Sequence, residues 1–285
     1  MRPVQSTSPS GDHRTSSSER IRLSGWGLVL GASSGFGAAT SLALAEAGLD
    51  VFGVHRDRKA TMGNVERLTA DIRARGRQAL FFNVNAADPE ARARTADEMA
   101  RVLDERGETG RLRVLLHSLA FGSLKPFVAD HSTDAVTAAQ MSMTLDVMAH
   151  TLVYWTQELV GRGLMGEGGR VFAMTSSGGT RALPSYGPVS AAKAALEAHV
   201  RQLAVELAPR GITVNAIRAG VTATPAAQKI PGYERLAAEA LRRNPSGRMT
   251  TAEDVARALV VLAHPDTAWI TGNVIGVDGG EDIVG

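Results

Sequence analysis

The sequence predicts a doubly wound α/β fold, in which a seven-stranded parallel sheet carries helices on both faces. Short apolar runs alternate along the chain with Ala- and Leu-rich segments that are long enough to form crossover helices. Strands that alternate with helices form βαβ units, and repeated βαβ units build a parallel sheet. The seven predicted strands are Trp26–Leu30, Val51–Val54, Ala79–Val84, Arg113–His117, Arg170–Met174, Thr213–Ile217 and Asn273–Val277.

Length and composition predict one domain over residues 22–285, after a tail over residues 1–21 that is rich in Ser, Thr, Pro and Arg and that we expect to be disordered. The net charge of +2 is too small to indicate a nucleic-acid or membrane partner. The absence of cysteine excludes disulfides and thiolate catalysis, and the histidines show no metal-ligand spacing. No apolar run reaches the roughly 20 residues of a membrane span, and no secretory signal is visible. We therefore expect a cytoplasmic protein without a metal.

The first predicted strand leads into a glycine-rich turn, Gly31-Ala32-Ser33-Ser34-Gly35-Phe36-Gly37, and the helical segment after it ends at Gly48. A helix N-terminus offers unpaired N–H groups and a positive dipole end, and glycines let the backbone approach a pyrophosphate. This turn is therefore predicted to bind a dinucleotide, as in Rossmann-type domains.

The same residues also fit G-x-S-x-G, the nucleophile elbow of serine hydrolases, with Ser33 as the nucleophile. That alternative is disfavoured because the elbow normally follows several strands, and because no histidine stands out as a partner for Ser33.

Tyr186 and Lys193 form a second candidate site. Pro188 favours the first turn of a helix, so Tyr186 is expected at the helix start and Lys193 about two turns into it. An ammonium near a phenol lowers the pKa of the phenol, which gives a proton donor for use near neutral pH. Taken alone, the pair also fits a loop tyrosine beside an unrelated surface lysine. Ser176 favours a shared site, because it follows a predicted central strand at the edge where open α/β sheets bind ligands.

These motifs together resemble the short-chain dehydrogenase/reductase family over nearly the whole chain after the tail. The resemblance rests on the glycine turn, Ser176, Lys193, the strand that ends in Val214-Asn215-Ala216-Ile217, and the closing residues 270–280. Most of that family carries a tyrosine four residues before the lysine, where this chain has Val189.

The position of Tyr186 gives the spacing Y-x6-K, which resembles a divergent branch of the family, the enoyl-acyl-carrier-protein reductases of fatty-acid biosynthesis. His117-Ser118-Leu119-Ala120, Asp146, Ala219-Gly220 and the residues 181–186 resemble the same branch. Ser176 departs from it, because many of its members carry a second tyrosine at that position.

The resemblance implies a nicotinamide-dependent reductase that forms a homotetramer and uses Tyr186, Lys193 and Ser176 as catalytic residues. Lys193 is expected to hold the nicotinamide ribose hydroxyls, and Thr222 and Thr224 to meet the carboxamide and the pyrophosphate. The residues expected to bind the cofactor are Gly31, Ser33, Ser34, Gly35, Phe36, Gly37, His55, Arg56, Arg58, Asn83, Val84, Ser118, Leu119, Ala120, Lys193, Gly220, Thr222 and Thr224.

The end of the second predicted strand favours NADPH over NADH. NADH enzymes usually place an acid there to hold the ribose hydroxyls, whereas this chain reads Val54-His55-Arg56-Asp57-Arg58. Arg56, Arg58 and His55 are the cations that could meet a 2′-phosphate. A solvated charged loop is the simpler alternative.

The function that fits these features best is NADPH-dependent reduction of the 2,3 double bond of an enoyl thioester, carried by acyl carrier protein or coenzyme A. A carbonyl reductase acting on a 3-oxoacyl or polyketide substrate and a non-catalytic dinucleotide-sensing protein are the alternatives, and Val189 is the best support for the last. Residues 223–249 resemble a mobile substrate lid, in which Arg242 and Arg243 could meet an acidic carrier protein.

Overall fold

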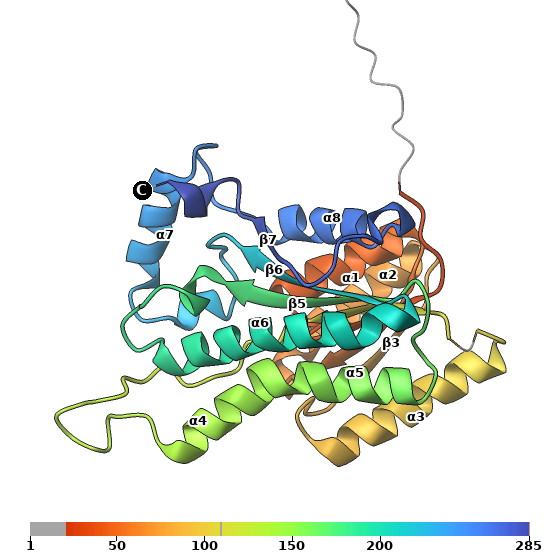
Figure 1. Ribbon diagram of the computed structural model, residues 1–285, viewed down its shortest axis with the longest axis horizontal. Helices are drawn as coiled ribbons and strands as arrows, with labels where there is room; N and C mark the ends of the chain where they lie inside the picture. Colours follow the sequence, from red (N-terminus) through yellow and green to blue (C-terminus); the bar gives the residue numbers. More distant parts are fainter. Residues whose placement is uncertain (1–20, 109, 285) are drawn as a thin grey trace, which may run out of the picture.

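The computed structural model describes residues 21–108 and 110–284, so nearly all of the predicted tail lies outside the described residues. A single parallel sheet has the strand order β3-β2-β1-β4-β5-β6-β7, which confirms the predicted Rossmann-type doubly wound architecture (Figure 1). Its strands are β1 (Trp26–Leu30), β2 (Asp50–His55), β3 (Ala79–Asn83), β4 (Leu112–His117), β5 (Arg170–Ser176), β6 (Thr213–Ala219) and β7 (Val274–Val277).

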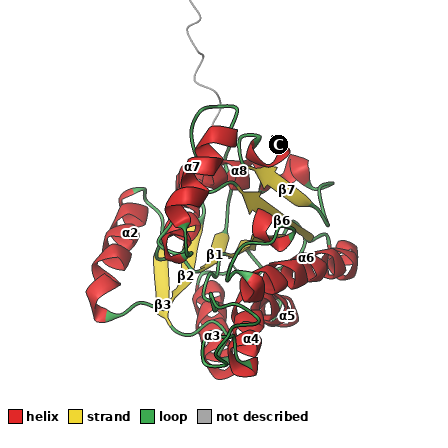
Figure 2. Ribbon diagram, turned by 90° about the vertical axis from the view of Figure 1, so that its left-hand side faces the viewer, coloured by secondary structure: helices red, strands yellow, loops and turns green. Residues whose placement is uncertain are grey.

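Helices cover both faces of the sheet, as predicted (Figure 2). One face carries α1 (Gly35–Ala47), α2 (Met62–Ala74) and α8 (Ala252–Leu262). The other carries α3 (Pro89–Glu105), α4 (Ala138–Leu145), α5 (Thr151–Gly161) and α6 (Gly187–Leu207), with a short π-helix, η2 (Asp146–His150), between α4 and α5. The remaining helix, α7 (Tyr233–Arg243), lies beside the last short turn, η7 (Glu281–Ile283).

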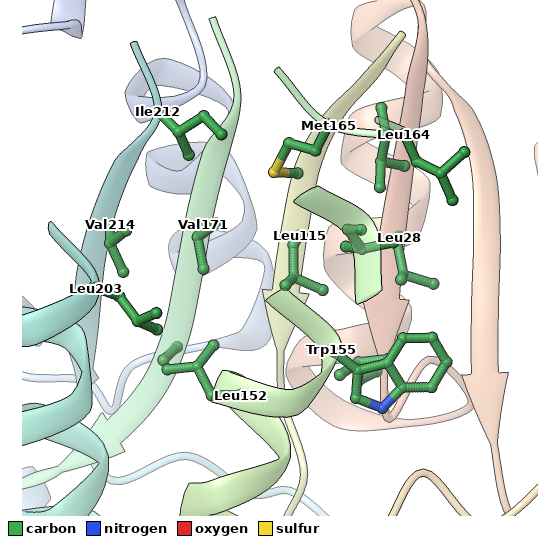
Figure 3. Packing of buried hydrophobic residues seen from close by; sticks show 14 of the residues in the cluster. Leu28, Leu115, Leu152, Trp155, Leu164, Met165, Val171, Leu203, Ile212 and Val214 are labelled. Carbon is green, nitrogen blue, oxygen red and sulfur yellow. The ribbon is translucent and has the colours of Figure 1, made fainter. Parts of the chain in front are cut away.

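The central strands are apolar throughout because both of their faces are covered. Trp26, Phe52 and Trp155 are among the largest fully buried side chains, and the rings of Trp26 and Phe52 stack with centroids 4.2 Å apart. Figure 3 shows side chains of β1, β4, β5 and β6 packed against Leu152 and Trp155 of α5 and Leu203 of α6. Because these large side chains are fully buried and closely packed, the sheet forms a rigid platform for the loops at its edge.

Two local predictions about the helix ends are confirmed. Gly48 ends α1 with a left-handed backbone at φ 112°. Tyr186 is the N-cap residue of α6, with Pro188 in the first turn. Among the described helices, none has the length and apolar character to cross a membrane.

Candidate active site

The predicted site residues gather at the carboxyl edge of the sheet. The glycine turn follows β1, Ser118 follows β4, Ser176 ends β5, and Gly220 follows β6. Chain order reverses between β1 and β4, which is the point where open α/β sheets bind their ligands. The predicted residues from four strands are thus brought to one edge.

The glycine turn fits a dinucleotide pyrophosphate. A Cβ on Gly37 would lie 2.0 Å from the carbonyl oxygen of Gly31, so the turn closes on itself only with glycine there. Ser34 caps α1 without a side-chain hydrogen bond, and the first turn of α1 holds no acid. The first N–H groups of α1 are therefore available to an anion. Thr224, after β6, approaches Gly35, because a Cβ on Gly35 would lie 3.1 Å from its methyl group.

Tyr186, Ser176 and Lys193 form one buried cluster. Tyr186 is only 8% exposed and hydrogen bonds with Ser176, whose Oγ also accepts from the Gly178 N–H at 3.0 Å. Lys193 is 6% exposed, and its Nζ donates to the Met174 carbonyl oxygen at 2.6 Å. The alternative of a surface lysine beside a loop tyrosine is therefore wrong.

The ionisation of this cluster differs from the sequence expectation. Burial raises the pKa of the Tyr186 phenol, and the hydrogen bond with Ser176 offsets only part of that rise. Burial also lowers the pKa of Lys193 to about 8, although the carboxylate of Glu197 opposes this change. The predicted lowering of the Tyr186 pKa by Lys193 is therefore wrong: burial and Ser176 set this pKa, and the Lys193 ammonium donates to the Met174 carbonyl oxygen instead. Tyr186 thus stays a protonated donor at neutral pH.

His117, the last residue of β4, is a fully buried histidine beside this cluster. The sequence places it in a family motif but predicts no role for its imidazole. The Thr151 hydroxyl donates to the Val147 carbonyl oxygen at 2.8 Å. Because its one proton is used there, the same hydroxyl oxygen accepts from His117 Nε2–H at 2.7 Å. Burial, followed by the charge of Lys193, lowers the pKa of His117 to about 3. The imidazole is therefore neutral, and Lys193 is the cation of the cluster.

The loop after β2 holds the carboxylate of Asp57, two residues beyond the strand end. Asp57 accepts from His55 Nδ1 at 2.9 Å, and its backbone is fixed by the side chain of Asn83 at 3.0–3.1 Å. Burial raises the pKa of Asp57, but hydrogen bonds with Thr61, Ser33 and His55 outweigh it and lower the pKa overall. Ser33 of the glycine turn thus meets a carboxylate rather than a histidine, which removes the support for a nucleophile elbow.

Of the three cations predicted at this corner, the structure leaves two on the surface. His55 is only 4% exposed and hydrogen bonds with Asp57. Its predicted contact with a 2′-phosphate is therefore disfavoured. Arg56 and Arg58 are exposed, and their guanidinium groups form no hydrogen bond or ion pair with the described residues. Asn83 is exposed, and Val84 directly follows β3.

The remaining predicted cofactor residues lie around the turn after β1 and the segment after β6. Ser118 packs on the turn, because a Cβ on Gly31 would lie 2.4 Å from its carbonyl oxygen. A Cβ on Gly31 would also lie 3.5 Å from a methyl group of Leu119, and Ala120 is exposed. Thr222 and Thr224, two and four residues after Gly220, are 6% and 8% exposed.

Tyr186 faces apolar neighbours on its other side. It packs with Met148 and Val189, and Leu124, Leu183 and Ile230 join the same cluster. Val189, at the position where related enzymes carry tyrosine, is buried here as a packing residue. An open groove of about 480 Å³ lies next to the start of α6, and the two chain neighbours of Tyr186 line it. The lining residues are Pro126, Phe127, Ala182, Leu183, Ser185, Gly187, Ser190 and Ala191. These surroundings suit an acyl group.

The two arginines of the predicted lid have partners within the chain. Arg243 donates to the carbonyl oxygens of Val284 at 3.0 Å and Glu281 at 3.1 Å, and Arg242 pairs with Glu239 at 2.6 Å. Arg243 therefore connects α7 to the residues after β7, and the role of Arg242 and Arg243 on an acidic carrier protein stays a prediction.

A doubly wound sheet with a glycine-rich turn after its first strand and a buried Tyr–Lys pair is typical of a dinucleotide-dependent oxidoreductase. Residues 31–281 match the family described as Enoyl-(Acyl carrier protein) reductase, and the chain belongs to this family within the short-chain dehydrogenase/reductases. It is a nicotinamide-dinucleotide-dependent reductase.

Individual relatives cover nearly the whole chain. An enoyl-[acyl-carrier-protein] reductase [NADH] of Nostoc sp. is 31% identical over 259 residues, which are 91% of this chain and 95% of the relative. The 1-cyclohexenylcarbonyl-CoA reductase of Streptomyces collinus is 29% identical over 276 residues, which are 95% and 91% of the two chains. A short-chain dehydrogenase of Burkholderia cenocepacia in complex with NADP superimposes with a TM-score of 0.74 at 29% identity, covering 92% of this chain and 99% of the other.

Proposed function

We propose that the protein reduces the 2,3 double bond of an enoyl thioester with NADPH. The observation that carries this proposal is the buried phenol of Tyr186, placed seven residues before Lys193 and beside an apolar groove. Two relatives are described as reductases of enoyl-acyl-carrier-protein and of a cyclohexenylcarbonyl-CoA, and both of these substrates are unsaturated thioesters.

The position of the phenol suits a conjugated thioester. In a ketone, the carbon that accepts hydride and the oxygen that needs a donor belong to one carbonyl group. In an enoyl thioester, hydride adds to C3, whereas negative charge develops on the thioester oxygen, further along the molecule. A tyrosine that is displaced by three residues from the more common position, Val189, can reach that second oxygen.

The residues of the chain would divide the work. The reduced nicotinamide supplies the hydride when the dinucleotide is bound. The turn at 31–37 would hold the pyrophosphate, Lys193 the ribose hydroxyls, and Thr222 the carboxamide. Tyr186 would donate a hydrogen bond to the thioester oxygen as its charge grows, because its raised pKa keeps it protonated. Ser176 would orient the phenol, and the apolar residues around Tyr186 would exclude water.

A paired assay separates this function from the alternatives. Oxidation of NADPH is followed with a crotonyl thioester and with an acetoacetyl thioester, on coenzyme A and on acyl carrier protein. We expect turnover of the crotonyl thioester and at least about tenfold lower kcat/KM for the acetoacetyl thioester. The reverse preference would identify a carbonyl reductase. A chain that binds NADPH and reduces neither substrate would be a dinucleotide sensor.

The preference for NADPH rests on Arg56 and Arg58, which follow β2, are exposed, and have no side-chain partner among the residues that the structure describes. The carboxylate of Asp57, which could otherwise select NADH, already accepts from His55, Ser33 and Thr61. We expect replacement of both arginines with alanine to raise the KM for NADPH about tenfold and to change the KM for NADH by less than about twofold. Replacement of the exposed, distant Arg94 with alanine is the control. Tighter binding of NADH than of NADPH by the unaltered chain would contradict the preference.

The homotetramer implied by the resemblance and the cytoplasmic location expected from the composition stay predictions.

A further inference from the structure

Residues 278–284, here called the 278–284 segment, follow β7 and lie beside α7 at the carboxyl edge of the sheet (Figure 1). Asp278 shapes this segment, because its carboxylate accepts from the N–H groups of Gly280 at 3.0 Å and Asp282 at 3.1 Å. Gly279 and Gly280 supply the left-handed backbone of the turn, with φ values of 63° and 88°. The turn presents two neighbouring acids, Glu281 and Asp282, to different parts of the site.

Asp282 holds the loop that carries the phenol. One of its carboxylate oxygens lies 2.7 Å from Arg181 Nη2, and its carbonyl oxygen accepts from the same nitrogen at 3.0 Å. The other carboxylate oxygen lies 3.1 Å from Arg218 of β6. Arg181 belongs to the residues 177–186 that connect β5 to Tyr186, so Asp282 anchors that loop to the sheet.

This loop needs an anchor because its own backbone is strained. Ser185, the residue directly before Tyr186, has φ 59°, a left-handed conformation that is unfavourable for any residue with a side chain. Strain of this kind persists only where the surrounding structure enforces it. The pairing of Arg181 with Asp282 is such an enforcing contact at the loop surface.

Glu281 holds the loop on the opposite side of the site. Its carboxylate accepts from the Val221 N–H at 3.0 Å, and a Cβ on Gly220 would lie 2.8 Å from the same oxygen. Gly220 and Val221 lead directly into Thr222 and Thr224. Glu281 is only 8% exposed, so this contact is shielded from water.

We propose that Asp282 is a positioning residue for Tyr186 and that Glu281 is a positioning residue for the loop after β6, so that one short turn sets the phenol and the dinucleotide relative to each other. Arg243 extends the arrangement to α7 through the carbonyl oxygens of Glu281 and Val284. The structural part stands on the contacts above, and the kinetic consequences rest on the proposed function.

Hydrogen exchange tests the structural part without any substrate. In Asp282→Ala and in Arg181→Ala, we expect the backbone amides of residues 177–186 to exchange about tenfold faster, whereas those of β1 and β4 keep their rates. The double variant should exchange less than the product of the two single effects predicts, because both changes remove the ion pair between Arg181 and Asp282. Asp71→Ala, at an exposed residue of α2, should behave as the unaltered chain. Unchanged exchange in Asp282→Ala would overturn the proposal.

Binding and turnover test the division between the two acids. Asp282→Ala should lower kcat about tenfold and keep the Kd of the dinucleotide within about twofold, whereas Glu281→Ala, which removes the acceptor of the Val221 N–H, should raise that Kd about tenfold. Equal effects of both variants on both quantities would contradict separate roles. Direct titration of the dinucleotide gives the Kd even if no thioester is reduced, so failure of the proposed function and failure of this inference are distinguishable.

Discussion

Replacement of Tyr186 with phenylalanine is expected to lower kcat for enoyl reduction about 100- to 1000-fold and to leave the Kd of the dinucleotide within about twofold. The ring would keep its place, because its neighbours Met148, Val189 and Leu183 are apolar. The variant loses only the hydroxyl, which is the one donor that the proposed mechanism aims at the thioester oxygen. Steady-state turnover and dinucleotide titration on the same preparation measure both quantities.

Tyr154→Phe is the matched control for this change. Tyr154 lies on α5 with 38% of its surface exposed, away from the cluster of Ser176 and Lys193. Its turnover should equal that of the unaltered chain. Activity of Tyr186→Phe within a few fold of the unaltered chain would show that another group donates to the substrate.

Replacement of Lys193 with methionine is expected to act in opposite directions on activity and on stability. Turnover should fall on the order of 100-fold, because the cation near the proposed ribose site is lost. The free energy of unfolding at neutral pH should rise by about 2 to 3 kcal/mol, because burial lowers the pKa of Lys193 from 10.5 to about 8 and the folded chain therefore holds this charge at a cost. Methionine fills a similar volume without a charge.

The pH dependence gives this prediction its sign. The folded chain binds the Lys193 proton less tightly than the unfolded chain, so stability rises with pH between about 8 and 10.5. Below about pH 8, the cost of the buried charge is present in full. The advantage of Lys193→Met should thus be greatest below pH 8 and should shrink as the pH rises above it. Denaturant unfolding at several pH values measures this, with Lys125→Met as the control. An advantage that grows above pH 8 would contradict the buried ammonium.

Much of the fold follows from local patterns in the sequence. The run Trp26–Leu30 is apolar at every position, which is typical of a strand covered on both faces, and it forms β1 with the predicted bounds. Pro188 marks the first turn of α6, and this places Tyr186 at the N-cap as predicted. The glycines at 31, 35 and 37 predict the turn between β1 and α1, and the structure leaves no room for a Cβ at Gly31 or Gly37.

The ionisation of the site did not follow from the sequence. The spacing of Tyr186 and Lys193 predicts that they are neighbours, but the direction of the Tyr186 pKa depends on burial by residues such as Ile230 and Met148, far along the chain. No acid ends the second strand in the sequence, yet hydrogen bonds with Ser33 and His55 hold the carboxylate of Asp57 at this corner of the site. Both are consequences of tertiary packing.

The role of the 278–284 segment was also missed. Asp282 meets Arg181 across 101 residues of sequence, and no local periodicity signals such a pair. The short run of acids around Gly279 and Gly280 was the available signal, since Asp side chains in glycine-rich turns often hydrogen bond to nearby backbone.

Transfer of a label tests the central claim most directly. The chain is supplied with NADPH that carries deuterium at nicotinamide C4, together with a crotonyl thioester, and the product is examined by NMR. The account predicts a saturated butyryl thioester with deuterium at C3 and a solvent proton at C2, and loss of this transfer in Tyr186→Phe. In a parallel reaction, an acetoacetyl thioester replaces the crotonyl thioester. The account would be contradicted if the crotonyl thioester stayed unchanged while deuterium appeared on the hydroxyl-bearing carbon of the product from the acetoacetyl thioester.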